Sequence, residues 1–257
     1  MEWKTTEDGK YRVESLSATT FPGLVKLLKD DFFYDENVCI GTEIDKNPLA
    51  GEELIELAAD AALDGNSLVA VEIATGQVVA MLINKVQVAP SDSSEKSFFE
   101  IFAEERCKQP SSRALVDLMI DLDTKCNYFE RYGVDCGIEL MYLGTHRQHR
   151  RKGLAKLLGQ TTMELAKKYR GGPYSKLTVE DLGPKYAFLK PKTPTTKDPK
   201  IFTGLWSAVG SQKFGEALGF TVLIRASLKE YFYNGKPYTD RIGAEAFCEG
   251  AARLIDL

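Results

Sequence analysis

The stretch His146 to Lys156 reads HRQHRRKGLAK; it follows the apolar run Leu140 to Leu143 and opens an amphipathic pattern. This order predicts a β-strand, a basic turn and a helix. The first N–H groups of a helix have no intrahelical partner and attract anions, and Gly153 and the small Ala155 let a ligand come close to the backbone. Basic side chains add positive charge at the same place: Arg147, Arg150, Arg151 and Lys152. The stretch therefore predicts a site for a phosphate-bearing ligand.

Other functions of such a basic turn must be weighed against this prediction. A P-loop needs a lysine followed by Ser or Thr, and no such pair follows Gly153, which argues against nucleoside triphosphate binding. A nuclear-localisation or nucleic-acid patch and a plain solvated turn also fit the local composition. The net charge of -4, the pI near 5.5 and the lack of a second basic stripe argue against nucleic acid. The flanking strand and helix favour the phosphate site over a solvated turn.

The bulk composition is that of a soluble, folded protein. With 257 residues, 44% of them hydrophobic and 27% charged, the chain is long enough for one large domain or two small ones. No internal repeat or long linker divides it, so we expect a single domain over residues 1–257. The first residues are polar, and no apolar run approaches the roughly 18 residues of a membrane span, which predicts a cytosolic protein without membrane attachment.

Cysteine and histidine usage argues against several chemistries. The five cysteines are odd in number and include no C-x-x-C pair, which fits neither a disulfide framework nor a zinc site and predicts reduced, mainly structural thiols. The two histidines, His146 and His149, both lie in the basic turn. A histidine metal centre or a Ser-His-Asp triad has too few residues here, so we expect no metal.

Hydrophobic periodicity predicts a mixture of helices and strands. Strands are expected at residues 11–15, 67–73, 78–86, 137–145, 176–180 and 220–228, with 67–73 and 78–86 as an antiparallel hairpin and 220–228 as the last strand of the sheet. Helices are expected at residues 21–33, 52–63, 98–108, 113–131, 153–170 and 211–218. Residues 89–96 are predicted to form a Pro/Ser-rich loop, and residues 181–202 an irregular basic loop or a lid over a site.

The basic turn also carries a family resemblance. Arg150-x-x-Gly153-x-Ala155 matches the R/Q-x-x-G-x-G/A signature of the GCN5-related N-acetyltransferases, and the order of elements is similar to their fold. The resemblance implies an α/β fold with a central mixed β-sheet flanked by helices, in which the central strands splay apart to admit the pantetheine arm of acetyl-CoA. It implies that the arm pairs with the free edge of the central strand at Tyr142, Leu143, Gly144 and Thr145. The pyrophosphate would bind at Arg150, Arg151, Lys152, Gly153, Leu154, Ala155 and Lys156.

Two further pieces narrow the resemblance to the insect arylalkylamine N-acetyltransferases and their polyamine-acetylating relatives. Phe32-Phe33-Tyr34-Asp35-Glu36 is similar to the F-F-x-D-E signature of that family. The segment Ser207 to Phe220, SAVGSQKFGEALGF, is similar to the family's S-x-x-x-S segment that ends in L-G-F. Together with the cofactor loop, these pieces span residues 32 to 220 in the same order as in the family.

The resemblance implies catalytic roles for three residues. Glu36 would be the general base, which the chemistry requires because an alkylamine with a pKa near 10 is protonated at neutral pH and cannot attack a thioester. Its alternatives are a solvated acid at a helix end and a base role for the neighbouring Asp35. Ser207 and Ser211 map onto the family serines and would hydrogen-bond the thiolate or the tetrahedral oxyanion; alternatively, Ser211 is an ordinary N-cap and Ser207 a loop hydroxyl.

Departures from the family pattern affect the site. The family often has a tyrosine acid where this chain has Gly215, so serine or water must protonate the thiolate, unless no acid does. Arg147 replaces a proline, Ala155 replaces the second glycine of the loop, and residues 181–202 are longer and more basic than is usual.

These observations predict an acetyltransferase that passes the acetyl group of acetyl-CoA directly to a small arylalkylamine or polyamine in a ternary complex. A covalent enzyme intermediate is not expected, because no histidine is placed to activate a cysteine. The alternatives are acetylation of a protein lysine and a non-catalytic acyl-CoA-binding domain. We expect a monomer that binds neither nucleic acid nor a membrane.

Overall fold

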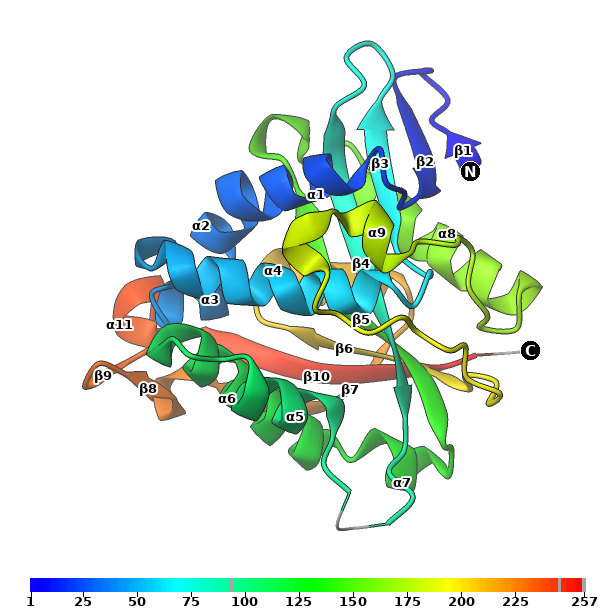
Figure 1. The fold of residues 1–257 in the computed structure, drawn as a ribbon. Helices are drawn as coiled ribbons and strands as arrows, with labels where there is room; N and C mark the ends of the chain where they lie inside the picture. The colour runs from blue at the N-terminus through cyan, green and yellow to red at the C-terminus, as the bar shows by residue number, and fades with distance from the viewer. Residues whose placement is uncertain (93–94, 245, 256–257) are drawn as a thin grey trace.

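A mixed sheet of eight strands forms the centre of the computed structural model, which describes residues 1–92, 95–244 and 246–255 (Figure 1). The strands lie in the order β1-β2-β3-β4-β5-β6-β10-β7, and among the described residues only β5 and β6 pair in parallel. Their bounds are β1 Glu2–Thr5, β2 Tyr11–Ser15, β3 Leu68–Glu72, β4 Val78–Val88, β5 Cys136–Thr145, β6 Ile201–Trp206, β7 Thr221–Ser227 and β10 Phe247–Leu254. A separate hairpin pairs β8 Phe232–Tyr233 with β9 Lys236–Pro237.

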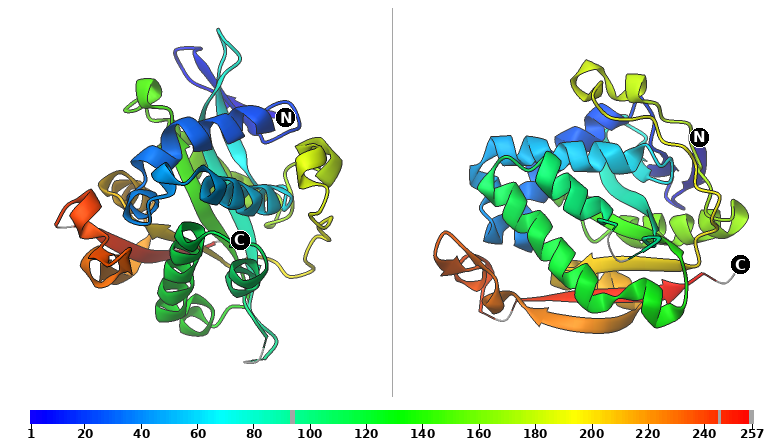
Figure 2. Two further views of the ribbon diagram at one scale, coloured as in Figure 1. Left: turned by 60° about the vertical axis from the view of Figure 1, so that its left-hand side comes forward. Right: turned by 60° about the horizontal axis from the view of Figure 1, so that its bottom comes forward.

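Helices cover both faces of the sheet, so its central strands are buried (Figure 1, Figure 2). One face packs against α1 Phe21–Leu27, α2 Phe33–Asp35, α3 Asn37–Gly41, α4 Pro48–Ala62, α5 Phe98–Glu105 and α6 Pro110–Cys126. The other face packs against α8 Leu154–Lys168 and α10 Val209–Ala217. Short helices α7 Tyr128–Tyr132, α9 Val179–Leu182 and α11 Thr239–Ile242 lie between these elements. This layered mixed sheet confirms the predicted fold class.

Three predictions for the second half of the chain were wrong. No strand forms at residues 176–180; the chain is irregular there and enters α9, with Leu177 and Val179 buried in the core. The strand that follows the cofactor helix is instead β6, which begins inside the predicted loop 181–202. The strand at residues 220–228 is not the last one, because β10 follows it and inserts between β6 and β7. These strands depend on pairing between distant segments, which a local pattern does not report.

Smaller differences have local causes. The helix predicted over residues 113–131 is divided at Asn127, whose left-handed backbone (φ 46°) separates α6 from α7. The helix predicted to begin at residue 52 begins at Pro48, after Asn47 caps it by accepting from the N–H of Ala50. Residues 93–94 of the predicted loop 89–96 lie outside the described residues.

The parallel strands β5 and β6 separate soon after they pair. Their register extends only from Gly137 opposite Ile201 to Glu139 opposite Thr203. A glycine is required where this pairing begins, because a Cβ on Gly137 would lie 2.8 Å from the Ile201 Cγ2 atom. The remaining residues of β5 therefore present a backbone edge that no strand of the described residues pairs with on the β6 side, which is the predicted splay.

Candidate active site

A cleft of about 600 Å³ opens where β5 and β6 diverge. The end of β5, the turn before α8 and the first turn of α10 form its walls, and the end of the first helical segment closes it. Its lining includes nine of the predicted cofactor residues: Leu143, Gly144, Thr145, Arg150, Arg151, Gly153, Leu154, Ala155 and Lys156. It also includes the three predicted catalytic residues: Glu36, Ser207 and Ser211. The structure thus brings together residues from both halves of the chain.

The backbone of the turn before α8 is shaped to bind an anion. Arg151 (φ 61°) and Gly153 (φ 78°) both adopt left-handed conformations, and α8 begins at the next residue, Leu154. Within the described residues, the N–H groups of residues 151–156 have no hydrogen-bond acceptor. Such N–H groups, at the positive end of a 15-residue helix and beside several cations, are suited to a phosphate group.

Two residues predicted to hold the cofactor have side chains outside the cleft. The Lys152 ammonium donates to the Tyr11 hydroxyl at 2.8 Å. The Tyr142 hydroxyl donates to the Leu54 carbonyl at 3.2 Å, on the opposite face of the sheet. Only the backbone of Tyr142 is therefore near the free edge of β5.

Sequence reasoning missed other residues that line the cleft, namely Asp31, His149 and Lys213. The His149 Nδ1 atom lies 2.9 Å from the Tyr11 hydroxyl. Burial, and then the charge of Lys152, lower the pKa of His149 below its ordinary value of 6.5, so the ring is neutral at pH 7. Lys213, one turn into α10, adds a cation that no local motif distinguished.

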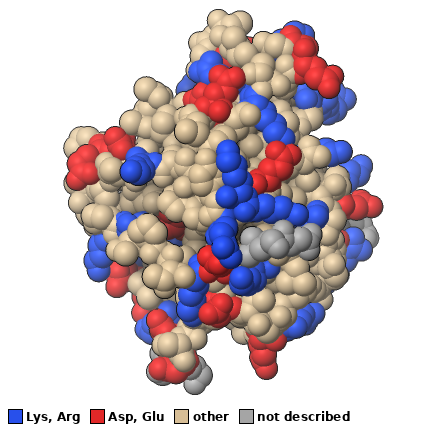
Figure 3. Space-filling view, turned by 90° about the vertical axis from the view of Figure 1, so that its right-hand side faces the viewer, with Lys and Arg blue, Asp and Glu red and all other residues tan. Residues whose placement is uncertain are grey.

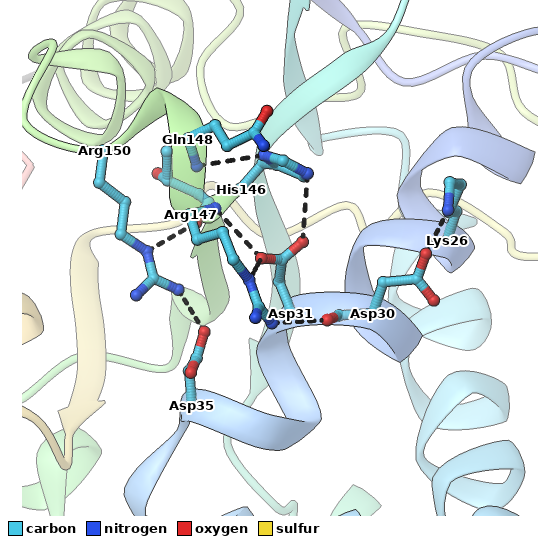
Figure 4. Close-up of polar contacts among 9 residues, drawn as sticks. Lys26, Asp30, Asp31, Asp35, His146, Arg147, Gln148 and Arg150 are labelled. Atoms are coloured by element: carbon cyan, nitrogen blue, oxygen red, sulfur yellow. Dashed lines mark hydrogen bonds and ion pairs between the residues drawn. The ribbon is translucent and has the colours of Figure 1, made fainter.

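A buried carboxylate anchors the cofactor turn to the first helical segment (Figure 4). Asp31, 3% exposed, lies in the π-helical turn Leu28–Phe32 and accepts from the Arg147 backbone N–H at 3.1 Å and from its Nε at 3.0 Å. Burial opposes ionisation, but the hydrogen bonds from Arg147 outweigh it and lower the pKa of Asp31. Arg147, which replaces the family's proline, therefore holds the turn in place.

A second ion pair crosses the cleft next to the first (Figure 4). The Arg150 guanidinium donates through Nη2 to an Asp35 carboxylate oxygen and through Nε to the Thr145 carbonyl at 3.0 Å. Asp35 therefore forms an ion pair with Arg150 of the cofactor motif, whereas its neighbour Glu36 does not. A diphosphate bound at this turn would compete with the Asp35 carboxylate for Arg150.

Replacing Asp35 with asparagine is expected to tighten coenzyme A binding. An exposed ion pair contributes up to about 1 kcal/mol, so releasing Arg150 should lower the Kd by up to about fivefold. Isothermal titration calorimetry with coenzyme A measures the change, and Arg150→Gln, which removes the cation itself, should weaken binding. A weaker Asp35→Asn complex would show instead that Asp35 orients Arg150 for the ligand.

Glu36 is fixed by its local backbone. Its extended conformation (φ -81°, ψ 130°) makes it the N-cap of α3, where its carboxylate accepts from the N–H groups of Val38 at 3.0 Å and Cys39 at 2.7 Å. The same carboxylate accepts a hydrogen bond from the Ser207 hydroxyl. The half-buried Glu36 is therefore a rigid acceptor at the junction of helix and cleft, not a freely solvated acid.

The two predicted serines differ in their partners. Ser207 follows β6 and is buried; its hydroxyl donates to Glu36, and its carbonyl accepts from the Asn37 side chain at 2.7 Å. Ser211 lies in the first turn of α10, where its hydroxyl donates to the Ala208 carbonyl at 2.9 Å and accepts from the Ala208 N–H at 3.2 Å. Ser211 is thus not the N-cap of α10, a position that Ala208 occupies.

A smaller cavity of about 70 Å³ adjoins the cleft. Phe32, Glu36 and Ser207 border both spaces. Its remaining lining is mostly apolar: Val38, Cys39, Leu115, Leu118, Met119, Glu139, Met141, Tyr142, Leu205 and Cys248. Both cysteines are buried, and burial raises the pKa of each thiol, so neither is a thiolate nucleophile at neutral pH.

The central strand is irregular between the two spaces. Ile83 of β4 pairs with Tyr142 and Asn84 pairs with Leu140, which leaves Met141 as an extra residue in a β-bulge. A bulge takes the extra residue out of the ladder and re-aims the backbone. The bulge places backbone polar groups where the cleft meets the small cavity.

Packing explains the absence of a tyrosine on α10. A Cβ added to Gly215 would lie 2.5 Å from the Trp206 Nε1 atom. The Trp206 ring is 2% exposed and packs edge-on against Phe214 and Phe220. The indole occupies the space that a side chain at this position would need, so α10 cannot supply an acid there.

The predicted lid at residues 181–202 covers neither the cleft nor the small cavity. The Lys192 ammonium instead binds Asp60 of α4 at 2.6 Å. A separate hollow of about 500 Å³ is lined in part by Arg170, Lys176, Lys192 and Lys197. Figure 3 shows Lys and Arg side chains gathered on the side of the molecule where α8 ends. The basic residues of this segment therefore form a surface away from the cleft.

No helix in the described part of the chain is both long and apolar enough to cross a bilayer. Within the same residues, no group of three or more His, Cys, Asp or Glu side chains is arranged to hold a metal ion.

The layered sheet, the splayed β5 and β6 and the basic turn before α8 constitute the fold of the GCN5-related N-acetyltransferases. The chain is similar in structure to arylalkylamine N-acetyltransferase 2 from Aedes aegypti, with a TM-score of 0.73 and 18% identity, covering 96% of this chain and 99% of that chain. The structure of mosquito arylalkylamine N-acetyltransferase like 5b is also similar, with a TM-score of 0.68 and 16% identity, covering 95% of this chain and 99% of that chain.

A polyamine N-acetyltransferase from Drosophila melanogaster, which catalyses the formation of N-acetylagmatine, also matches, with a TM-score of 0.68 and 13% identity over 95% of this chain and 99% of that chain. The sequence alone matches no protein-family model and no curated protein. The resemblance predicted from the sequence is therefore confirmed for the fold.

Proposed function

We propose that this protein is an N-acetyltransferase that passes the acetyl group of acetyl-CoA directly to the primary amine of a small arylalkylamine or polyamine. The junction at Glu36 and Ser207 supports this proposal most strongly. These two residues border both the cleft with the anion-binding turn and the apolar cavity beyond it. A thioester and an amine entering from opposite sides would meet there. The fold shared with arylalkylamine and polyamine N-acetyltransferases gives further support.

The donors of the cleft suit acetyl-CoA. The free N–H groups of residues 151–156 and the cations Arg150, Arg151, Lys156 and Lys213 would hold its phosphates. The open edge of β5 offers backbone groups to the amides of the pantetheine arm. When bound, acetyl-CoA supplies an activated acetyl group whose C–S bond breaks as the C–N bond to the amine forms.

The residues at the junction have separable roles. Glu36 accepts the proton that the ammonium substrate must lose before its nitrogen can attack, directly or through water. Ser207 orients the Glu36 carboxylate. Backbone N–H groups near the Met141 bulge would stabilise the developing oxyanion. Ser211 lines the cleft and is the candidate to hydrogen-bond the departing thiolate, since Gly215 offers no side chain.

Thiol release from acetyl-CoA tests this function. Dopamine, tryptamine, agmatine and spermidine should be offered separately, with a lysine-containing peptide as a further acceptor. Release with a small amine is expected. The cavity of about 70 Å³ favours a small amine over a protein lysine, which needs a long open groove. Tight coenzyme A binding without release from any acceptor would instead identify a non-catalytic binding domain.

Replacing Ser207 with alanine should lower turnover. The hydroxyl donates to the Glu36 carboxylate and fixes its orientation, and a hydrogen bond to a charged group contributes about 1.5–3 kcal/mol, so kcat/KM with a small amine should fall by at least about tenfold. Ser112→Ala is the matched control, because the Ser112 hydroxyl also donates to a carboxylate, that of Glu53, away from the cleft. An unchanged kcat/KM in Ser207→Ala would reduce Ser207 to a structural residue.

A further inference from the structure

The small cavity is lined by a second acid, Glu139, besides the half-buried Glu36. Glu139 lies on β5 and is 3% exposed. The walls of the cavity are largely apolar: Phe32, Val38, Leu115, Leu118, Met119 and Leu205. A carboxylate buried in such surroundings requires compensation by a hydrogen-bond donor or a cation.

The neighbouring side chains offset only part of the free-energy cost of burying the Glu139 carboxylate. The Gln87 Nε2 group donates to Oε2 of Glu139 at 2.8 Å, and none of the described residues donates to Oε1. Lys85 is the nearby cation, but its ammonium already binds Asp64 at 2.9 Å and lies 4.0 Å from Asp60. Asp123 on α6 is a second acid nearby, and burial, followed by the charge of Glu139, raises the pKa of Asp123 well above its ordinary value. Burial raises the pKa of Glu139 to about 7, against the opposing effects of Gln87 and Lys85.

The size of the cavity limits what enters it. At about 10–15 Å³ per water-sized group, 70 Å³ accommodates roughly five to seven such groups. A linear chain of four carbons with a terminal nitrogen fits this space, whereas an indole with its side chain does not. The apolar walls suit methylene groups, and the acid suits a terminal donor.

Building on the proposed function, we propose that Glu139 determines the acceptor: the site takes a short linear diamine, with one amine at Glu36 and Ser207 and the distal ammonium at Glu139. An ammonium offers three donors and a positive charge, so it satisfies the free carboxylate oxygen and neutralises the excess negative charge. A neutral hydroxyl would donate to the free oxygen of Glu139 but would not neutralise the carboxylate charge. An unsubstituted alkyl chain would neither donate a hydrogen bond nor neutralise the charge.

Three acceptors of matched length test this assignment: butane-1,4-diamine, 4-aminobutan-1-ol and butylamine, each with acetyl-CoA. A hydrogen bond to a charged group contributes about 1.5–3 kcal/mol, so the diamine should exceed butylamine in kcat/KM by at least about tenfold. Glu139→Gln, which keeps an oxygen for Gln87, should remove most of that difference and leave butylamine turnover little changed. Coenzyme A affinity equal to wild type verifies that the variant is folded.

A matched control and a binding measurement complete the design. Glu249 is also a buried glutamate, but Arg225 binds it at 2.7 Å and it does not line the cavity, so Glu249→Gln should preserve the diamine preference. Calorimetry with butane-1,4-diamine and coenzyme A reports acceptor binding without chemistry. Equal kcat/KM values for diamine and butylamine, or equal values for diamine and aminobutanol, would overturn the assignment. Diamine binding that depends on Glu139 but yields no acetylation would contradict the proposed function alone.

Discussion

Replacing Glu36 with glutamine is expected to abolish nearly all turnover while coenzyme A affinity stays unchanged. General-base catalysis contributes about a hundredfold to ten-thousandfold, and glutamine cannot accept the proton of the ammonium substrate. The N–H groups of Val38 and Cys39 donate to different oxygens of Glu36, and glutamine keeps one of these two acceptors, so the start of α3 is preserved better than in an alanine variant. Thiol release at saturating amine measures kcat, and calorimetry measures the affinity for coenzyme A.

A second N-cap separates loss of the base from loss of the cap. Asn47 caps α4 away from the cleft, by accepting from Ala50 at 3.3 Å. Asn47→Ala should lower stability by about 1 kcal/mol without reducing kcat, because it removes an N-cap and no base. A Glu36→Gln enzyme that retains kcat within a few-fold of wild type would place the base elsewhere.

Replacing Glu139 with glutamine is expected to stabilise the protein in the absence of substrate, increasingly so at higher pH. Burial raises the pKa of this carboxyl from 4.5 to about 7. Below pH 4.5 the group is protonated in both the folded and unfolded states, so it carries no penalty. Between pH 4.5 and about 7 the unfolded state releases a proton that the folded state retains, so the wild type loses stability as pH rises.

The expected gain follows from this difference in pKa. A shift from 4.5 to about 7 corresponds to about 3 kcal/mol, so Glu139→Gln should gain up to that amount relative to wild type between pH 4.5 and pH 8. Urea unfolding at several pH values measures it. Glu249→Gln, which removes the carboxylate charge that Arg225 neutralises, should show no such gain. A stability difference between Glu139→Gln and wild type that does not vary with pH would contradict the raised pKa.

Much of the site was predictable because its signals are local. The strand, the basic turn and the helix from residue 137 onward follow from apolar periodicity and a glycine at the helix start, and the structure places nine of the eleven predicted cofactor residues in the cleft. The motif containing Glu36 ends a helical segment that the 3.6-residue pattern also predicts.

The sequence by itself determined the mixed α/β class, the cofactor turn and the residues around Glu36, because hydrophobic periodicity and turn residues act over a few neighbouring positions. Only the tertiary structure decided the rest. The strands β6 and β10 form through pairing with each other, and Ser207 reaches Glu36 across 171 positions. In the sequence, nothing distinguishes Glu139 from the other residues of its strand. It faces the small cavity only because the splay of β5 and β6 and the packing of α3 and α6 form that cavity beside it. Such contacts depend on which surfaces the chain brings together, and no short stretch of sequence encodes that.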